Sequence, residues 1–359
     1  MIKKVKCRKY NIVVGYNVLK DIKQHIDIKK YSKIIIISEN KIYKLWSEKI
    51  KLSISKDYDK ILLKSGEKTK DIKSVEFICE KLVEFGADRK SLIINIGGGM
   101  ITDLGGFSAS IYMRGIDYIN IPTSLLAMVD ASIGGKNGVN IGGIKNIVGC
   151  FNEPKLVVID SEFLTTLPKR ELQSAYGEIV KHSIIKSAKY FKYLNENCID
   201  NYNIEDIIFN SLKIKKYFVE HDFKEKNIRK ILNFGHTIGH GIEAICMDCK
   251  KPLLHGEAVF IGMLIETKIA EKYNLIDKEN ANKIYKILDN FNVNKIIENV
   301  KSNLKKIDTK KIIQIIKKDK KNSNNSIKMV LPMKIGKCKY DILVNEKDII
   351  EQLNKVFVK

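Results

Sequence analysis

Cysteine is scarce in this sequence of 359 residues: seven are present, and only Cys246 and Cys249 lie close together in the chain. A single C-x-x-C pair, with no second pair to complete it, is a weak signal for zinc or redox chemistry. The other cysteines are scattered singly. This distribution excludes a strong metal-ribbon signature and favours ordinary reduced thiols in a cytoplasmic protein.

Long apolar runs are also missing. No stretch of about 18 apolar residues occurs, and the first residues, MIKKVKCRKY, lack the apolar segment of a secretory signal. We therefore expect a soluble protein with no membrane partner. Low-complexity tracts are absent, and an apolar fraction of 44% is enough to build hydrophobic cores. The length exceeds that of a usual single core, so two domains are expected.

Acidic residues are few relative to basic ones, and the formal net charge is +22. Such a charge raises the question of nucleic-acid binding. The lysines, however, are spread along the whole chain, and no zinc finger, helix-turn-helix or RNA-binding aromatic motif accompanies them. We therefore expect a solvated lysine surface and no nucleic-acid partner, although part of the excess could attract an anionic substrate.

Short runs rich in β-branched residues alternate with amphipathic segments in the first half of the chain. These runs are too short for helices, and five of them predict buried strands, at 33–38, 61–64, 91–96, 118–121 and 156–159. Between two of the strands, 71–85 has helical spacing and ends at Gly86, a suitable C-cap. This repetition predicts a parallel sheet with helices on both faces.

The pattern changes after Pro168, a residue suited to the first turn of a helix. From there the chain shows a series of helical patterns, including one over 204–223 and an apolar one over 258–270. We therefore place the domain boundary here. Residues 1–168 are expected to form an α/β domain, and residues 169–359 an all-α domain.

Three glycines, Gly97–Gly99, follow one of the predicted strands and open an apolar helix. Consecutive glycines let the backbone approach a ligand closely, and the N-terminus of the following helix favours a pyrophosphate. The segment departs from the G-x-G-x-x-G fingerprint, so dinucleotide binding and a simple tight turn both remain open. Residues 65–70 and 121–124 also follow strands, and such loops gather at the carboxyl edge of a parallel sheet, where ligands bind.

Residues 129–140, followed by Lys145 and Asn146, form a polar, glycine-rich stretch without a strong secondary-structure pattern. A backbone this permissive beside Lys136 suits a phosphate or a carboxylate. The alternative is a mobile surface loop, but a patternless run of this length is more often functional.

Histidine is rare, with six residues in the chain, yet three of them lie between His236 and His255. His236 and His240 are one helical turn apart, a spacing found in zinc sites that take two nitrogen ligands from one helix. A pair of surface histidines is the alternative. Gly235 and Gly239 strengthen the metal interpretation, because each costs a helix about 1 kcal/mol relative to alanine and so suggests close packing or a ligand.

A carboxylate, Glu178, interrupts the otherwise apolar helical pattern of 175–182. A carboxylate on such a face is costly to bury unless it is paired with a cation or bound to a metal. Glu178 is therefore the candidate for a third metal ligand. A surface salt bridge is an equally open alternative.

Nine motifs in series resemble the 3-dehydroquinate synthases of the sugar phosphate cyclase superfamily, and the resemblance covers nearly the whole chain. They are SGEKTK, GGGMITDLGGF, YMRG, IPTSLLAMVDASIGGKNGVN, KNIVG, YGEIVKH, RKILNFGHTIGH, LLHGEAV and DKK. The resemblance implies a Rossmann-like NAD-binding domain over 1–168, a helical metal- and substrate-binding domain over 169–359, and an active site in the cleft between them.

The reaction that the resemblance implies converts 3-deoxy-D-arabino-heptulosonate 7-phosphate to 3-dehydroquinate and phosphate, in the shikimate pathway. Bound NAD oxidises a ring hydroxyl, phosphate leaves by β-elimination, the same cofactor returns its hydride, and an intramolecular aldol step recloses the ring. One site then needs a cofactor, a Lewis acid and a cationic phosphate pocket together.

Site residues follow from the same resemblance. The divalent metal, zinc or cobalt, is placed on Glu178, His236 and His255, so His240 faces the substrate instead of pairing with His236. The catalytic positions are Asp130, Lys136, Lys181, Lys215, Glu225 and His240. The substrate-binding positions are Arg114, Asn146, Arg229, Asn233 and Lys320, with Lys321 as an alternative to Lys320. Arg229, Asn233, His236 and His240 would share one helix face, at intervals of 4, 3 and 4 residues.

The cofactor and partner assignments complete the implied site. Arg114 would reach the phosphate pocket of a neighbouring subunit, which implies a homodimer. The NAD contacts are Glu67, Lys70, Gly98, Gly99, Met100, Ile101, Thr102, Asp103, Thr123, Ser124, Lys136, Lys145, Phe163, Leu164, Thr165 and Thr166.

Three departures from the family pattern concern the cofactor. Thr102 replaces a glycine, Ile144 precedes Lys145 where a glycine is usual, and Ser38 stands where an acidic residue often binds the adenine ribose, although Glu39 is adjacent. The alternatives are another sugar phosphate cyclase, such as one making 2-deoxy-scyllo-inosose, or a metal-dependent dehydrogenase like glycerol dehydrogenase. The first would differ in its substrate contacts, and the second would release NADH.

Overall fold

The computed structural model describes residues 2–54, 57–142, 144–196, 203–247, 249–304, 307–319 and 326–357. The chain divides into two compact units. The first comprises Met1–Pro168 with Asn203–Lys216, and the second comprises Lys169–Tyr202 with Tyr217–Lys359. The change of unit after Pro168 falls where the sequence pattern changes, whereas 203–216 groups with the first unit. The assignment of 1–168 and 169–359 as functional domains stays a prediction.

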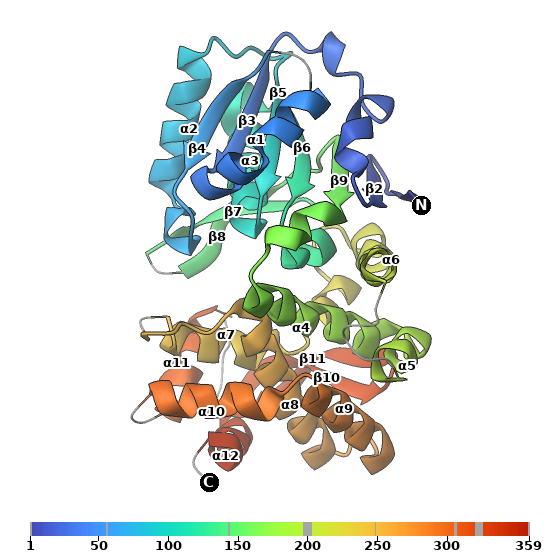
Figure 1. Cartoon of the computed structure of the whole chain (residues 1–359). Coiled ribbons are helices and arrows are strands. Elements are labelled where there is room, and N and C mark those ends of the chain that lie inside the picture. The colour runs from blue at the N-terminus through green and yellow to red at the C-terminus, as the bar shows by residue number, and fades with distance from the viewer. Residues whose placement is uncertain are drawn as a thin grey trace. The chain divides into compact units, whose positions relative to one another are not determined.

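The first unit is built on a seven-stranded sheet in the order β1-β2-β9-β6-β5-β3-β4 (Figure 1). Every neighbouring pair is parallel except β1 and β2. Four of the five expected strands, β9, β6, β5 and β3, form its centre because their apolar runs are buried on both faces, as Ile34–Ile37 illustrate, and the fifth, β4, lies at the edge. The strands are β1 Lys3–Lys6, β2 Asn11–Gly15, β3 Ile34–Glu39, β4 Asp59–Leu63, β5 Leu92–Gly97, β6 Asp117–Pro122 and β9 Leu156–Asp160.

Three long helices connect the central strands: α1 Asn40–Ile54, α2 Ile72–Glu84 and α3 Gly99–Ile111. The chain moves outward from β3 to β4 and then returns past β3 to β5 and on to β6. Right-handed crossovers therefore put α1 on one face of the sheet and α2 with α3 on the other. The direction of winding therefore reverses between the neighbouring strands β3 and β5. Their carboxyl ends form the switch point at which such sheets bind ligands.

The glycine-rich stretch after β6 is more regular than its sequence suggests. A π-helical turn, Ala127–Ala131, is followed by an antiparallel hairpin of β7, Lys136–Ile141, and β8, Ile144–Phe151. The hairpin is possible because its two glycines let the strands touch: a Cβ on Gly138 would lie 2.6 Å from the carbonyl oxygen of Val148. The expectation of a patternless loop is therefore wrong for these residues.

The second unit is mostly helical, but the expectation that it is all-α is wrong, because it contains one antiparallel strand pair. Its strands are β10 Ser326–Lys334 and β11 Lys337–Asn345. Its helices are α4 Lys169–Lys186, α5 Ala188–Glu196, the end of α6 Ile204–His221, η8 Ile228–Asn233, α7 His236–Ile245, α8 His255–Lys272, α9 Lys278–Asn290, α10 Val293–Asn303, α11 Thr309–Asp319 and α12 Glu346–Phe357. Within the described residues, no helix is both long enough and apolar enough to cross a membrane.

The stretch 229–240 is not one continuous helix. A 3₁₀ helix, η8, ends at Asn233, and α7 begins at His236 after Gly235 adopts a φ of 80°. This left-handed conformation suits glycine, and a Cβ there would also lie 2.9 Å from the carbonyl oxygen of Val259. Hence Arg229 and Asn233 do not share a helix face with the two histidines, and that expectation is wrong.

Candidate metal and cofactor sites

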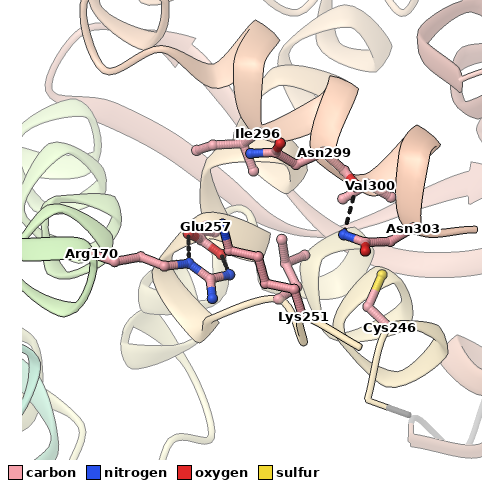
Figure 2. A pocket seen from close by; sticks show the side chains of 9 residues that line it. Arg170, Cys246, Lys251, Glu257, Ile296, Asn299, Val300 and Asn303 are labelled. Carbon is pink, nitrogen blue, oxygen red and sulfur yellow. Dashed lines mark hydrogen bonds and ion pairs between the residues drawn. The ribbon is translucent and has the colours of Figure 1, made fainter. Parts of the chain in front are cut away.

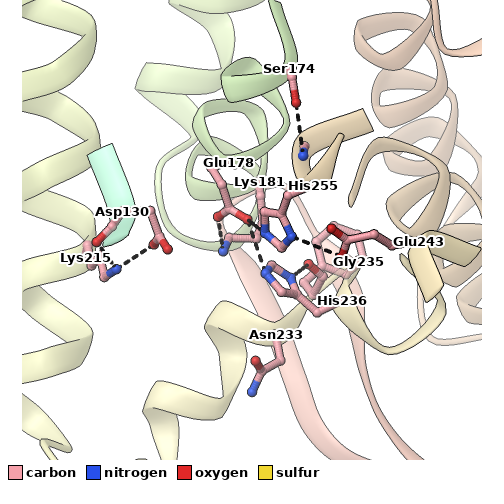
Figure 3. Close-up of polar contacts among 12 residues, drawn as sticks. Asp130, Ser174, Glu178, Lys181, Lys215, Asn233, Gly235, His236, Glu243 and His255 are labelled. Atoms are coloured by element: carbon pink, nitrogen blue, oxygen red, sulfur yellow. Dashed lines mark hydrogen bonds and ion pairs between the residues drawn. The ribbon is translucent and has the colours of Figure 1, made fainter. Parts of the chain in front are cut away.

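Three side chains of the second unit converge on one point (Figure 3). Oε1 of Glu178 lies 3.2 Å from Nε2 of His236 and 3.3 Å from Nε2 of His255. Glu178 comes from α4, and the histidines are the first residues of α7 and α8. Ligands that hold zinc tetrahedrally at 2.0–2.1 Å lie about 3.3 Å apart, so these spacings suit such an ion.

Glycines allow the helices that carry these groups to meet. A Cβ on Gly177 would lie 2.3 Å from the carbonyl oxygen of Gly256, and a Cβ on Gly256 would lie 1.7 Å from that of Ser174. The backbones of α4 and α8 are thus in direct contact beside Glu178 and His255. This packing requires glycine at position 177, next to Glu178, and at position 256, next to His255.

The electrostatics of the cluster separate its two histidines. Glu178 is fully buried, yet its ion pair with Lys181 and its contact with His236 outweigh burial and lower its pKa well below the usual value. Burial and the Lys181 charge lower the pKa of His236 to about 4. Burial also opposes the charged form of His255, but hydrogen bonds to Glu178 and Glu243 raise its pKa to about 10. A buried, ionised carboxylate between two imidazoles is a donor set that fits a divalent cation.

Each histidine has a second contact that orients its ring. Nδ1 of His236 lies 3.2 Å from the carbonyl oxygen of Phe234, and Nδ1 of His255 lies 3.6 Å from Oε2 of Glu243. If the Nδ1 atoms carry hydrogen, both Nε2 lone pairs point toward Glu178. Such outer contacts are typical of histidines that bind metals.

His240 lies beside this trio, with its ring centroid 5.2 Å from that of His236 and 5.8 Å from that of His255. His240, Glu243 and His255 form a second group close enough to share an ion. The two groups have His255 in common. His240 is therefore close enough to the trio to contact a substrate oxygen held there.

In the first unit, a polar cluster joins the loop after β4 to α3 and to the β7–β8 hairpin. Nζ of the buried Lys70 lies 2.5 Å from Oδ2 of Asp103 and 2.5 Å from Oδ1 of Asn146. Asn140 donates to Oε1 of Glu67 at 2.9 Å and accepts from the backbone of Asn146. Burial raises the pKa of Asp103 although Lys70 opposes the shift, and the nearby carboxylates raise the pKa of Lys70 in spite of its own burial.

The glycine loop lies at the start of α3, beside the switch point. A Cβ on Gly98 would meet Oγ of Ser124 at 3.4 Å, and a Cβ on Gly99 would meet the Ala131 side chain at 3.1 Å. The backbone of Gly98 and Gly99, which carries no side chains, therefore packs against Ser124 and Ala131. Met100 and Ile101 are buried in the core, so only their backbone atoms could contact a cofactor.

Residues 60–174 match the family profile of the 3-dehydroquinate synthase N-terminal region, and 175–322 match that of its C-terminal region. A 3-dehydroquinate synthase of Dictyoglomus thermophilum is 42% identical over 97% of this chain and 96% of its own length. The chain belongs to the 3-dehydroquinate synthase family.

Solved structures of related cyclases share its fold. One is a 2-deoxy-scyllo-inosose synthase complexed with carbaglucose-6-phosphate, NAD+ and Co2+, with a TM-score of 0.88, 26% identity and 99% of both chains covered. Another is a 2-epi-5-epi-valiolone synthase from Streptomyces hygroscopicus with NAD+ and Zn2+ bound, with a TM-score of 0.84, 24% identity and 99% of both chains covered. The much higher identity to the 3-dehydroquinate synthase means that another cyclase activity is not favoured for this chain.

Two more pairs of expected family residues lie in contact. Nζ of Lys215 lies 2.6 Å from Oδ1 of Asp130, which belongs to the π-helical turn. In the second unit, Asn233 donates to Oε1 of Glu225 at 2.7 Å, and Glu225 has a φ of 55°. A non-glycine residue at such a φ is uncommon and often marks a functional segment.

Other expected substrate residues differ widely in exposure. Arg229 is buried, and its Nη1 donates to the carbonyl oxygen of Phe223 at 2.6 Å, so a substrate anion would have to compete for it. Lys136, by contrast, is exposed at the start of β7. Arg114 has a φ of 66° after α3. Lys320 and its alternative Lys321 lie outside the described residues.

The remaining cofactor positions lie in three places: directly after β6, within the β7–β8 hairpin, and after β9. Thr123 and Ser124 come directly after β6, and Lys145 is in β8. Residues 163–166 lie in η6, Ser161–Thr166, where Phe163 is core-packed against Trp46 with ring centroids 4.9 Å apart. Leu164 and Thr165 lie on this turn, and Thr166 accepts a hydrogen bond from the Trp46 indole. Residues 123–124 and 163–166 thus follow the carboxyl ends of strands in the seven-stranded sheet, whereas Lys145 lies within the hairpin.

The departures at Thr102 and Ser38 have local explanations. Thr102 is buried in α3 and donates its hydroxyl hydrogen to the carbonyl oxygen of Gly99, so no glycine is needed there. Ser38 is buried and donates to the carbonyl oxygen of Ile96 in β5. Glu39, at the end of β3 beside the switch point, is partly exposed and is the better candidate for a ribose contact.

Sequence reasoning missed several residues that support the metal site. Arg170 forms two hydrogen bonds with Glu257 and one with the carbonyl oxygen of Pro252, which ties α4 to the start of α8 beside a small pocket (Figure 2). Glu243 lies two turns after His236 on α7, so its helical spacing from that histidine could have indicated a residue near the metal site. Glu266 interrupts the apolar pattern of 258–270 as Glu178 interrupts that of 175–182, so it carried the same kind of signal.

Proposed function

We propose the following account of how this chain performs the reaction of its family, the conversion of 3-deoxy-D-arabino-heptulosonate 7-phosphate to 3-dehydroquinate and phosphate. The chain is an enzyme of the shikimate pathway that uses NAD and a divalent metal. The observation that carries the residue assignments is the trio of Glu178, His236 and His255, whose carboxylate is buried and which lies within the residues that match the family's C-terminal profile.

Glu178, His236 and His255 would hold zinc or cobalt through one carboxylate oxygen and two imidazole nitrogens. When bound, such an ion supplies a Lewis acid that lowers the pKa of a coordinated substrate hydroxyl and polarises a carbonyl. Lys181, ion-paired with Glu178, balances the buried charge of that ligand when the metal is absent. Lys181 and His240 lie beside this trio and would exchange a proton with the reacting oxygens.

The first unit would hold NAD at the switch point, with Gly98 and Gly99 against the pyrophosphate and Glu39 near the ribose. NAD, when bound, accepts a hydride from the substrate and later returns it. Lys70 and Asp103 keep the loops after β4 and β5 together. The contacts at Thr123, Ser124, Lys145 and 163–166 belong to the same proposal.

The substrate carries a phosphate and a carboxylate, so cationic and amide groups are required to bind it. Lys136, Asn146, Arg229, Asn233 and Lys320 would supply them. Glu225 holds the Asn233 amide in place, and Lys215 and Asp130 balance each other's charge. Asp130, Lys215 and Glu225 therefore act by positioning and by balancing charge.

We further propose that the protein is a cytoplasmic homodimer in which Arg114 contributes to the partner's phosphate pocket. Five exposed apolar side chains lie near Arg114 in sequence or on the adjoining hairpin: Ile111, Met113, Ile141, Ile147 and Phe151. Ile147 and Phe151 are four residues apart on β8 and so point to the same face. An exposed apolar group of this kind favours association with a second copy.

The activity is tested with purified protein, NAD and a divalent metal. We expect phosphate release from the heptulosonate phosphate without net NADH accumulation, because the hydride returns to the substrate. Steady accumulation of NADH would instead indicate a dehydrogenase. Absence of phosphate release would refute the proposed function.

The metal assignment is tested separately with two histidine variants. His255→Ala should lose bound metal and activity together, whereas His240→Ala should keep the metal and lose turnover. Metal content is measured by elemental analysis of the purified variants. Loss of metal from the His240 variant would show that the second group, with Glu243, holds the ion instead.

A further inference from the structure

A carboxylate that belongs to neither proposed metal group is buried beside the first turn of α7. Glu266, on α8, has no solvent exposure. Its Oε2 accepts a hydrogen bond from the backbone N–H of Gly235 at 2.6 Å, and its Oε1 accepts one from Ile238 at 3.2 Å. These two donors flank His236, the first residue of α7.

The two donors occupy the positions that a helix must satisfy at its N-terminus. Gly235 is the N-cap of α7 and has no side chain to cap the helix, and Ile238 is the third helical residue. In a capping box, two side chains of the same segment bond to these two N–H groups. Here Glu266 serves both from another helix, and the positive end of the α7 dipole stabilises its charge.

Close packing fixes the distance between the two helices at this point. A Cβ on Gly262 would lie 1.8 Å from the carbonyl oxygen of Gly235, so only glycine fits there. Gly262 is one turn before Glu266 on the same face of α8. The start of α7 is therefore held to α8 by a backbone contact and by two hydrogen bonds to one carboxylate.

We propose that Glu266 is a positioning residue for the metal site: it orients the first turn of α7 so that His236 reaches the ion. The proposal rests on the proposed metal ligands. Helix α8 then sets both histidines, because it begins with His255 and carries the carboxylate that anchors His236. Glu266 itself touches neither the ion nor the substrate.

If Glu266 only capped α7, its substitution would lower the stability of the protein and leave metal affinity unchanged. The test therefore measures the binding of Co2+ to the metal-free protein. Glu266→Gln keeps the size of the side chain but replaces one accepting oxygen with an NH2 group, which repels one of the two N–H donors. We expect its dissociation constant for Co2+ to rise about 10- to 100-fold, as for the loss of other groups that orient metal-binding histidines. The visible absorption of bound Co2+ should change as well.

Thr267→Val is the matched control. Thr267 is the next residue on α8, equally buried, and its hydroxyl donates to the carbonyl oxygen of Met263 instead of to α7. We expect this variant to lose stability but to bind Co2+ within about twofold of the unaltered protein, with the same spectrum. A drop in affinity equal to that of Glu266→Gln would mean that general loosening of α8 explains the effect, and the proposal would be overturned.

Wild-type affinity and an unchanged spectrum in Glu266→Gln would also overturn the proposal. If that variant does not fold, Glu266→Asp replaces it: the shorter side chain reaches at most one donor, and the same weakening is expected. Failure of the metal assignment has a different signature. In that case the unaltered protein would bind no Co2+, or His236→Ala would bind it with unchanged affinity.

Discussion

His255 directs its two ring nitrogens at two different carboxylates: Nε2 lies 3.3 Å from Oε1 of Glu178, and Nδ1 lies 3.6 Å from Oε2 of Glu243. Without a metal, both contacts favour the protonated ring, and the pKa of His255 is raised to about 10 in spite of its burial. With a metal on Nε2, the Nδ1 hydrogen would still have Glu243 as its acceptor. Glu243 is thus suited to orient the ring.

Glu243→Ala should therefore weaken metal binding without removing a ligand. We expect a loss of affinity of about 10-fold or more, because the His255 ring loses the acceptor that fixes its orientation. Competition with a chromophoric chelator measures the dissociation constant. Glu279→Ala, an exposed position on α9, is the control and should change nothing. An unchanged constant in Glu243→Ala would show that Glu178 and backbone packing suffice to orient His255.

Much of this architecture is readable from the sequence. The isoleucine runs predict the central strands because a strand buried on both faces needs apolar residues at every position, as in Ile34–Ile37. Glu178 on an apolar helix is a metal candidate for a similar reason, whereas the histidine spacing predicted His236 with His240, and His255 followed only from the family resemblance. A charged or titratable group at an apolar position requires a partner.

The sequence could not show which helix ends meet. The 4, 3 and 4 spacing through 229–240 fits a helix, and the break at Gly235 depends on the backbone of α8 lying against it. Glu266 interrupts an apolar helix and so requires a partner, but the sequence could not show that this partner is the start of α7, a tertiary neighbour. The β7–β8 hairpin was missed because paired glycines carry no hydrophobic period.

Removing the metal should lower the stability of the protein. A ligand that binds only the folded state stabilises it by about 4 kcal/mol when present at 1,000 times its dissociation constant. We expect the melting temperature to fall when a chelator is added and to recover with Zn2+ or Co2+. His236→Ala should melt at the same temperature with and without metal. A recovery that persists in His236→Ala would place the ion elsewhere.

Lys70 and Asp103 should show strong coupling in a double-mutant cycle. Lys70→Met leaves the partly buried Asp103 carboxylate without its ion pair, and such a loss costs up to about 3–5 kcal/mol when the remaining charge is fully buried. Adding Asp103→Asn removes the unpaired charge, so the double variant should regain much of the free energy of unfolding measured in urea. The affinity for NAD, measured by fluorescence quenching, should be weaker than that of the unaltered protein both in Lys70→Met and in the double variant. Additive effects on stability would show that the two side chains do not interact.

Asp222 should make part of the stability depend on acid pH. Its carboxylate accepts hydrogen bonds from the backbone N–H groups of Lys226, Asn227 and Arg229 at 2.9, 2.6 and 3.1 Å, and so holds the loop that carries Glu225. Burial alone would raise the pKa of Asp222, but these donors outweigh it and lower the pKa below its ordinary value of 3.8.

A carboxyl group with a lowered pKa in the folded state stabilises the protein above its unfolded-state pKa, and this contribution disappears as the pH falls through the folded-state value. We expect Asp222→Asn to unfold about 1–3 kcal/mol more easily at pH 7, since one acceptor oxygen becomes a donor facing N–H groups. The difference should be constant from pH 7 to about pH 5 and should shrink below about pH 4, near the unfolded-state pKa. Urea unfolding at several pH values measures it, with the exposed Glu279→Gln as control. A difference that stays the same at pH 3 would show that the lost hydrogen-bond geometry, and not the charge, accounts for the whole effect.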